Sequence, residues 1–548
     1  MKKILFFLLL GFSLIAGGNV QAQTMGVMVH DTGSTDNGYI LFAPVSYTDS
    51  YLIDKCGRLM HSWHSAYEPG QSLYLLPDGN LLRSGRIDNN NFIAGGRGGI
   101  IELMDWDSNV LWSFIVSDSI QCQHHDIRPM PNGNILVVSW DYKSPAEAIV
   151  AGRDTAKLDT CLWPEKILEL QPIGNDSAEI VWEWRVWDHL VQEYDSTKAN
   201  YGLVTDHPEL INLNFTRPNQ LKERDWIHMN SVDYNPYLDQ IVMSVHNMNE
   251  FWIVDHSTTK AEASGHSGGN SGKGGDLLYR WGNPLVYKHG TVANKKLFGQ
   301  HSVEWIKPGL PYAGSIILFN NGANRPTGSF STVDIITTPV DSNGVYNSTL
   351  PYLPTALTWT YQATVPATFF SAKVSGSQIL TNGHIIACLG DPGKLFEFDE
   401  LKSTVWKYYV PVGSNGPLTQ GSTPIENATF RCTFYPDTFS GFNNHVMTPG
   451  LPVELNSAII CELYTGINNT KKNTGATVFP NPSNDYFTVK DIDCITEMIL
   501  TNLDGQMIRY IKNHKSINTR DLGNGIYLLR IYDCYGSCSY RKVVVSKR

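Results

Sequence analysis

The chain has 548 residues, with 42 lysines and arginines against 52 aspartates and glutamates, and a formal net charge of −10. A nucleic-acid partner favours a basic surface, so this balance argues against one. Hydrophobic residues make up 42% of the chain, and 14 tryptophans, 26 tyrosines and 47 glycines accompany few helix-forming runs. We therefore expect a large all-β core with many turns.

The first 22 residues have the pattern of a secretory signal. Lys2 and Lys3 form the charged end, an apolar run follows, and Val20-Gln21-Ala22 fits a small-x-small cleavage site. The apolar run ends at Gly17-Gly18, which is too short to span a bilayer. We predict that residues 1–22 are a signal peptide, that the protein is exported through the periplasm, and that no integral membrane segment remains after cleavage.

Nine cysteines in an exported chain allow disulfides. No spacing among them matches a zinc-binding pattern. By position in the sequence we predict three bridges, Cys122–Cys161, Cys432–Cys461 and Cys534–Cys538.

A weak repeat of paired strands runs through most of the chain. Its first half is a hairpin closed by an Asp-Gly or Asn-Gly turn, as in residues 72–84, 126–139 and 378–389. Its second half ends in an aromatic residue that we assign to packing between the repeats. These residues are Trp63, Trp112, Trp182, Trp281, Trp359 and Trp406.

Four-stranded repeats of about 40–50 residues are typical of a β-propeller. We predict a six-bladed β-propeller over residues 23–466, whose first blade is completed by pairing the two ends of the domain. Two long insertions, 186–222 and the glycine-rich 264–275, interrupt the spacing. Loops of this length are usually functional or lid-like.

The composition changes after the propeller. Residues 467–475 form a polar linker, and 476–548 contain short strands with Asn-Pro, Asp-Gly and Asn-Gly turns, which predict a small C-terminal β-sandwich. With FPNP at 479–482, GIY at 525–527 and a basic end, this segment resembles the C-terminal sorting domain of type IX secretion. The resemblance implies the type IX machinery as a partner and a secreted or cell-surface protein. The alternative is an ordinary accessory sandwich.

Histidines occur at the starts of the inner strands of successive repeats. His228 and His246 bracket one hairpin, and the start of one antiparallel strand lies beside the end of the next, so we expect them to be close. Aligning the hairpin turns adds His125 and His301. We predict that His125, His228 and His301 occupy equivalent positions around one mouth of the central channel, with Asp126 available to orient an imidazole.

The second strands end at the same mouth and contribute polar side chains. These are His246, Asn247, Asn320 and Asn321, followed by Arg325. The group has no carboxylate pair for glycoside hydrolysis, no Gly-x-Ser-x-Gly elbow and no phosphate loop. Imidazole nucleophiles, an arginine fork and amide donors suit transfer of an anionic group. A metal site is the competing use of the histidines.

WIHMNSV with SVHN, GQHSVEW followed by ILFNNGANR, and the PNGN turn resemble the bacterial aryl-sulfate sulfotransferases over residues 38–440. The resemblance implies a six-bladed propeller that moves a sulfuryl group between phenols through a sulfohistidine, without a nucleotide sulfate donor and without a cofactor or metal. It implies catalytic roles for His228, His301 and Arg325. Substrate binding is then expected from His125, His246, Asn247, Asn320 and Asn321. The partners are a phenolic sulfate donor and a phenolic acceptor.

The last repeat departs from this family. The family's nucleophilic histidine lies there, where this chain reads SGSQILTNGHIIACLG with Ser375 at the position aligned with His125. His384 follows the hairpin turn at the opposite end, and Cys388 lies closer to the mouth. Two alternatives to sulfuryl transfer therefore stay open. One is a surface-displayed propeller that binds an anionic or aromatic ligand without turnover, and the other is a metal-dependent hydrolase or lyase.

Overall fold

A computed structural model describes residues 23–217, 220–347, 349–457, 476–492, 494–502, 507–534 and 538–547. The predicted signal peptide (1–22), the linker (467–475) and Cys461 lie outside the described residues. The helices of the described residues are all too short or too polar to cross a bilayer.

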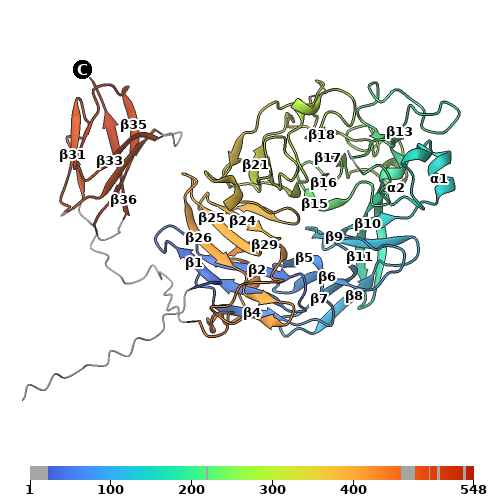
Figure 1. Cartoon of the computed structure of the whole chain (residues 1–548), viewed down its shortest axis with the longest axis horizontal. Coiled ribbons are helices and arrows are strands. Elements are labelled where there is room, and N and C mark those ends of the chain that lie inside the picture. Colours follow the sequence, from blue (N-terminus) through green and yellow to red (C-terminus); the bar gives the residue numbers. More distant parts are fainter. Residues whose placement is uncertain are drawn as a thin grey trace, which may run out of the picture.

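Six antiparallel sheets are arranged around a central axis and form the predicted six-bladed propeller (Figure 1). The innermost strand of each blade is given first in the lists that follow. Blade 1 contains β29 (Thr429–Pro436), β2 (Gly38–Pro44), β3 (Ser50–Asp54) and β4 (Leu59–Trp63). Blade 2 contains β5 (Pro69–Leu75), β6 (Leu81–Arg86), β7 (Gly99–Met104) and β8 (Val110–Ile115). Blade 3 contains β9 (Gln121–Pro129), β10 (Ile135–Asp141), β11 (Glu165–Ile173) and β12 (Ser177–Arg185).

The second half of the ring repeats this order. Blade 4 contains β15 (Met229–Asn235), β16 (Gln240–Val245), β17 (Glu250–Asp255) and β18 (Tyr279–Trp281). Blade 5 contains β19 (His301–Trp305), β20 (Ile316–Asn320), β21 (Thr332–Ile336) and β22 (Trp359–Tyr361). Blade 6 contains β23 (Gly376–Ile379), β24 (Ile385–Leu389), β25 (Lys394–Phe398), β26 (Thr404–Tyr409) and, outermost, β1 (Gly26–His30).

The two ends of the propeller close the ring. The C-terminal strand β29 pairs with β2, with Tyr39 opposite Tyr435, as predicted. A second closure was not predicted, because β1 pairs with β26 and extends blade 6 to five strands. The six aromatic residues at the ends of the repeats all lie in fourth strands, and Trp63, Trp112, Trp182, Trp281 and Trp406 are buried between sheets. Their burial shows that the recurring aromatic residues serve core packing between the blades.

Short elements fill the connections between blades. They are α1 (Pro145–Val150), α2 (Lys260–Ala263), the 3-10 turns Thr155–Lys157, Val186–Asp188, Val292–Asn294, Pro366–Thr368 and Ser440–Phe442, and the strand pairs β13 (Leu190–Val191) with β14 (Ile211–Asn212) and β27 (Val412–Gly413) with β28 (Gly416–Pro417). The first insertion, 186–222, folds onto the propeller, since Val186, Leu190, Ile211 and Leu213 are buried in the same apolar cluster as blades 3 and 4.

The C-terminal segment is the predicted β-sandwich. One sheet contains β30 (Thr477–Phe479), β31 (Tyr486–Lys490) and β34 (Ser516–Asn518), and the other contains β33 (Met507–Lys512), β32 (Glu497–Thr501), β35 (Gly525–Tyr532) and β36 (Cys538–Val545). Phe487, Met498, Leu529 and Val543 are among the residues of its separate apolar core.

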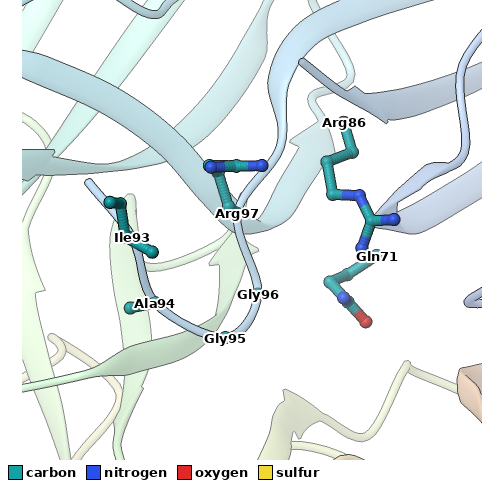
Figure 2. Close-up of a pocket in the computed structure, with 7 residues that line it drawn as sticks. All are labelled: Gln71, Arg86, Ile93, Ala94, Gly95, Gly96 and Arg97. Atoms are coloured by element: carbon teal, nitrogen blue, oxygen red, sulfur yellow. The ribbon is translucent and has the colours of Figure 1, made fainter. Parts of the chain in front are cut away.

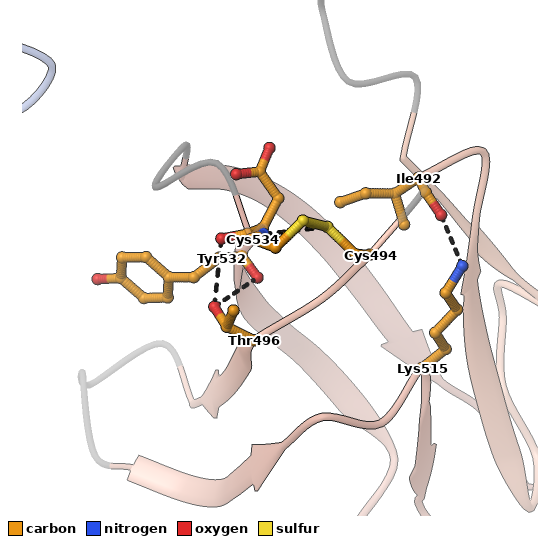
Figure 3. The surroundings of a disulfide bond; sticks show 7 residues. Ile492, Cys494, Thr496, Lys515, Tyr532 and Cys534 are labelled. Carbon is orange, nitrogen blue, oxygen red and sulfur yellow. Dashed lines mark hydrogen bonds between the residues drawn. A yellow bond between two sulfur atoms is a disulfide. The ribbon is translucent and has the colours of Figure 1, made fainter. Parts of the chain in front are cut away.

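The disulfide predictions were wrong. Cys534 bonds Cys494, not Cys538, with the two Cα atoms 5.8 Å apart (Figure 3). Cys122, Cys161 and Cys432 are buried free thiols. Cys122 and Cys161 pack instead among Phe92, Trp140 and Trp163, where they act as small apolar side chains.

Buried charges join the blades across the channel. Arg431 of blade 1 forms an ion pair with Asp126 of blade 3, and the Tyr74 hydroxyl of blade 2 donates to the same carboxylate at 3.0 Å. Arg128 pairs with Asp233 of blade 4 at 2.7 Å. Both arginines lie 3.6 Å from Glu304 of blade 5. Five blades thus share one buried network.

Truncating Arg431 tests this network. Removing one member of a buried pair leaves the other charge uncompensated and costs about 3–5 kcal/mol. We expect Arg431→Ala to lower the free energy of unfolding in urea by about this amount. The control is Arg224→Ala, because Arg224 pairs with Asp159 on the surface and exposed pairs contribute about 0–1 kcal/mol. Similar losses in both variants would contradict the structural role of the network.

Candidate functional site

Five histidines form a continuous chain at one mouth of the channel. The ring centroids of His125 and His228 are 4.6 Å apart, those of His228 and His246 are 5.2 Å apart, and those of His246 and His301 are 5.3 Å apart. His124, which sequence reasoning missed, extends the chain, with its Nδ1 atom 2.9 Å from Nδ1 of His125. The predicted proximity of His228 and His246 is therefore confirmed.

The prediction that His125, His228 and His301 occupy equivalent repeat positions holds for His125 and His301 and was wrong for His228. Ser72, Asp126 and Ser231 each accept a backbone N–H of the next blade, from Ile127, Val232 and Val303. The residues just before these acceptors are Gln71, His125 and Asn230. In blade 5 the same register gives this position to His301, two residues before Val303. His228 lies two residues earlier than Asn230. It reaches the group because the start of β15 is irregular and His228 has a φ of 55°.

His228 is held by Asp225 rather than by Asp126. The Nδ1–H of His228 donates to Oδ2 of Asp225 at 2.5 Å, and Asp126 is occupied by Arg431 and Tyr74. Burial lowers the pKa of His228, but the charge and hydrogen bond of Asp225 outweigh burial, so the net pKa is raised. Asp225 lies just beyond the first insertion, three residues from His228 in the sequence.

The other four histidines are neutral. Burial lowers the pKa of His124 and of His301 to about 3 and lowers the pKa of His125 and His246 well below the usual value. His228 adds to the lowering in each case through charge repulsion. One imidazole that favours its proton therefore lies among four that do not, and such a separation of pKa values assigns acid and base roles.

Hydrogen bonds set the tautomers of the neutral rings. The Nδ1–H of His301 donates to Oδ1 of Asn321 at 2.8 Å, and that of His246 donates to Oδ1 of Asn247 at 2.8 Å, which leaves a lone pair on each Nε2. Nε2 of His124 is buried without a hydrogen-bond partner in the described structure. The proton of His124 therefore belongs on Nδ1, which donates to His125, and His125 carries its own proton on Nε2.

The predicted amides have two different roles. Asn247 also donates to the carbonyl oxygen of Asp225, and Asn321 donates to Ser371 and Val374 of the blade 5 to blade 6 connection. Asn320 does not contact a histidine. It belongs to a neighbouring group, in which its Nδ2 donates to Asp334 and its Oδ1 accepts from the Phe298 backbone.

Arg325 belongs to this neighbouring group. Its guanidinium donates to Thr332 and to the carbonyl of Phe330, and it lies 5.0 Å over the Phe298 ring. Lys295 lies 4.7 Å over the same ring. Phe298 precedes Gly299, and a Cβ at Gly299 would be 3.0 Å from Nε2 of His246. The two cations therefore lie next to the histidine chain without touching it.

A cavity of about 410 Å³ opens beside the loop 93–97 (Figure 2), whose Gly96 packs against the His125 ring. Its lining residues are Gln71, Arg86, Ile93, Ala94, Gly95, Gly96 and Arg97. Figure 2 shows Arg86 and Gln71 facing the loop that carries Arg97. This loop pairs with β9, since the N–H of His125 donates to the Gly96 carbonyl at 2.8 Å. Both guanidinium groups are paired with carboxylates, Arg86 with Glu68 and Arg97 with Asp88, so their charges are compensated.

The last blade contains no histidine at this mouth. His384 lies at the far end of its hairpin, where Nδ1 is 2.8 Å from Glu397, which also pairs with Lys55. Ser375 occupies the bulge position, with a φ of 96°, and donates to Ser371. Cys388 is buried, and burial raises the pKa of its thiol well above the usual value. Neither His384 nor Cys388 joins the site.

The sequence profile described as Arylsulfotransferase (ASST) matches residues 48–407. A second profile, the secretion system C-terminal sorting domain, matches residues 477–546 and indicates secretion or attachment at the cell surface. No curated protein sequence matches the chain.

Several solved structures are similar to this chain at low identity and with low TM-scores. A virginiamycin B lyase from Staphylococcus aureus is 10% identical, covers 72% of this chain and 87% of its own length, and has a TM-score of 0.33. The periplasmic gluconolactonase PpgL of Pseudomonas aeruginosa is 11% identical, with 93% and 100% coverage and a TM-score of 0.36. Hydrazine synthase of Kuenenia stuttgartiensis is 14% identical, with 57% and 71% coverage and a TM-score of 0.30. Likeness at this level says nothing about activity.

Substitutions at two neighbouring glycines test the position of His125. Gly96 has a φ of +84°, and a Cβ there would lie 1.9 Å from Cε1 of His125, whereas a Cβ at Gly95 would meet nothing within 4 Å. We expect Gly96→Ala to destabilise the fold by at least about 1–2 kcal/mol, the cost of the left-handed backbone alone, and to shift the NMR signals of His125. Gly95→Ala is the matched control. Equal stability and unchanged His125 signals in both variants would contradict this packing.

Proposed function

Because the chain belongs to the arylsulfotransferase family, we propose that it transfers a sulfuryl group from a phenolic sulfate ester to a phenolic acceptor through a sulfohistidine. The family profile covers residues 48–407 and therefore includes every histidine of the channel mouth. No nucleotide sulfate donor takes part in the proposed reaction. The observation that carries the proposal is the separation of pKa values between His228 and the neutral histidines beside it.

His301 is the proposed nucleophile. Asn321 and the Gly299 carbonyl both accept from its Nδ1, so Nε2 holds the lone pair, and the lowered pKa keeps the ring neutral. An unprotonated imidazole nitrogen is a competent nucleophile. The family's nucleophilic histidine lies in the last blade, where this chain has no histidine at the mouth, so the covalent step falls to blade 5 in this proposal.

The first half-reaction forms an N–S bond. The Nε2 lone pair of His301 attacks the sulfur of the aryl sulfate, and the bond from sulfur to the phenolic oxygen breaks. His228 gives its proton to the departing phenolate, a step that general acid catalysis accelerates by about 10²–10⁴-fold. The Nε2–H of His125 donates to a sulfuryl oxygen, and Arg325 contributes positive charge nearby.

The second half-reaction reverses these steps with a new phenol. His228, now neutral, takes the proton of the acceptor hydroxyl, and the phenolic oxygen attacks the sulfur. The N–S bond breaks and returns the lone pair to His301. In this proposal the cavity beside His125 receives the aryl part of donor and acceptor, and His246, Asn247, Asn320 and Asn321 hold the surrounding groups in position.

Turnover of a chromogenic aryl sulfate tests the reaction. We expect release of the phenol chromophore to depend on added acceptor phenol and to survive EDTA at 25 °C. After donor alone, tryptic mass spectrometry is expected to find a sulfuryl group on His301. His301→Gln abolishes this label, and His384→Gln, which changes a histidine at the opposite end of a blade, retains it.

Three results would each contradict a different part of the proposal. Loss of turnover in EDTA would favour the metal-dependent hydrolase or lyase. Binding of the ester without turnover would favour a binding propeller. A label on His246 or His228 would leave sulfuryl transfer intact and overturn the choice of nucleophile.

The pH dependence tests the role of His228. The acid must hold its proton, so kcat/KM declines as the pH rises through the raised pKa of His228. Asp225→Asn removes the negative charge that raises this pKa, and we expect the decline to move to lower pH. Asp49→Asn is the control, because Asp49 forms the same type of pair with the exposed His64. An unchanged profile in Asp225→Asn would remove His228 from the acid role.

A further inference from the structure

A second histidine cluster lies at the outer circumference, between blades 3 and 4. His189 follows β12, His266 lies within the glycine-rich insertion 264–275, and Asp276 follows that insertion directly. The Nδ1 atoms of His189 and His266 lie 2.9 Å and 2.8 Å from the same oxygen, Oδ1 of Asp276. These three atoms all lie within 4.8 Å of one another. His189 is fully buried, and 62% of the His266 side chain is exposed.

The hydrogen bonds of His189 require one additional positive charge. Nε2 of His189 is 2.9 Å from the Ala263 carbonyl oxygen, which only accepts, so Nε2 carries a proton. In a neutral ring Nδ1 then has a lone pair, and it faces a carboxylate oxygen. Two acceptors at 2.9 Å repel each other unless a proton or a metal ion lies between them.

The surroundings match those of a metal-binding histidine. Metal-ligating imidazoles usually donate their other N–H to a carbonyl or carboxylate, which fixes the ring, and Ala263 does this for His189. Trp184 stacks on His189 with ring centroids 5.7 Å apart and donates to the Gly275 carbonyl at 2.7 Å. Gly275 allows the close approach, since a Cβ there would lie 2.6 Å from Nε2 of His189.

We propose that His189, His266 and Asp276 bind Zn²⁺, with Nδ1 of each histidine and Oδ1 of the aspartate as ligands. Two nitrogens and one carboxylate oxygen suit zinc. Zinc bonds of about 2.0–2.1 Å at tetrahedral angles separate ligand atoms by about 3.3 Å, so the carboxylate moves back by about 0.5 Å. Water occupies the fourth position beside the exposed His266.

The ion holds the glycine-rich insertion against the propeller. The loop between α2 and β18 contains His266, and it has four glycines at positive φ, which leaves its backbone with a high entropy when it is not tied down. One zinc ion joins this loop to His189 at the end of blade 3. From the sequence we expected no metal and considered one only at the channel-mouth histidines. His189 and Asp276 are 87 residues apart, and only the fold joins them.

The site is tested by measuring metal binding to the full chain, expressed without its signal peptide and without a histidine tag. After chelation and dialysis, we expect one Zn²⁺ per chain by elemental analysis, a higher Tm with added Zn²⁺, and visible d–d bands of a four-coordinate ion with Co²⁺. His266→Ala changes an exposed side chain and leaves the fold intact. It is expected to weaken Zn²⁺ affinity by at least about 10-fold, as is Asp276→Asn.

His207→Ala is the matched control. His207 is exposed and forms a similar pair with Glu209, Nδ1 to Oε1 at 3.0 Å, without a third group. The zinc affinity of the His207→Ala variant is expected to equal that of the parent chain. Absence of a bound ion, or unchanged affinity in His266→Ala, would overturn the proposal and leave His189 as a buried cation paired with Asp276. Neither result bears on sulfuryl transfer, which is measured separately.

Discussion

The buried ion pair between Arg431 and Asp126 is the interaction on which the channel depends. It links the inner strand of blade 1 to that of blade 3, while Arg128 links blade 3 to Asp233 and both arginines approach Glu304. Burial lowers the pKa of Arg431, but Asp126, Tyr74 and Glu304 more than compensate, so the pKa is raised and the charge persists. Charges this deeply buried are tolerated only in pairs.

This network also determines which carboxylate the neighbouring histidines can use as a hydrogen-bond acceptor. Asp126 follows His125 directly in the sequence, yet Arg431 and Tyr74 occupy its Oδ1 and the Val232 N–H occupies its Oδ2. His228 must therefore take its acceptor from Asp225, which lies outside the repeat. The result is a single imidazole with a raised pKa among four neutral ones. In the proposed reaction, the acid and the nucleophile are therefore the same residue type and differ because only His228 has a carboxylate partner.

The positive charges are arranged around this neutral group. Arg325 and Lys295 lie over Phe298, and Arg86 and Arg97 line the cavity beside His125. Burial lowers the pKa of Lys295 to about 8, so this lysine is the rim cation that loses its charge first as the pH rises. In the proposed reaction, an anionic ester meets cations at the edge of the mouth and, inside it, neutral imidazoles beside His228, whose pKa is raised.

The sequence alone determined the six blades, the closure of the ring by its own ends and the separate C-terminal sandwich. These follow from strand periodicity, Asp-Gly and Asn-Gly turns and repeated aromatic residues, which are all local signals. It also brought His228 and His246 together, since one hairpin contains both. Only the tertiary structure decided which carboxylate serves His228, which cysteines pair, and that His189 meets Asp276. These residues all lie in irregular segments outside the regular strands, Cys494 and Cys534 in the C-terminal sandwich and the others beside blades 3 and 4, so strand periodicity does not predict their partners.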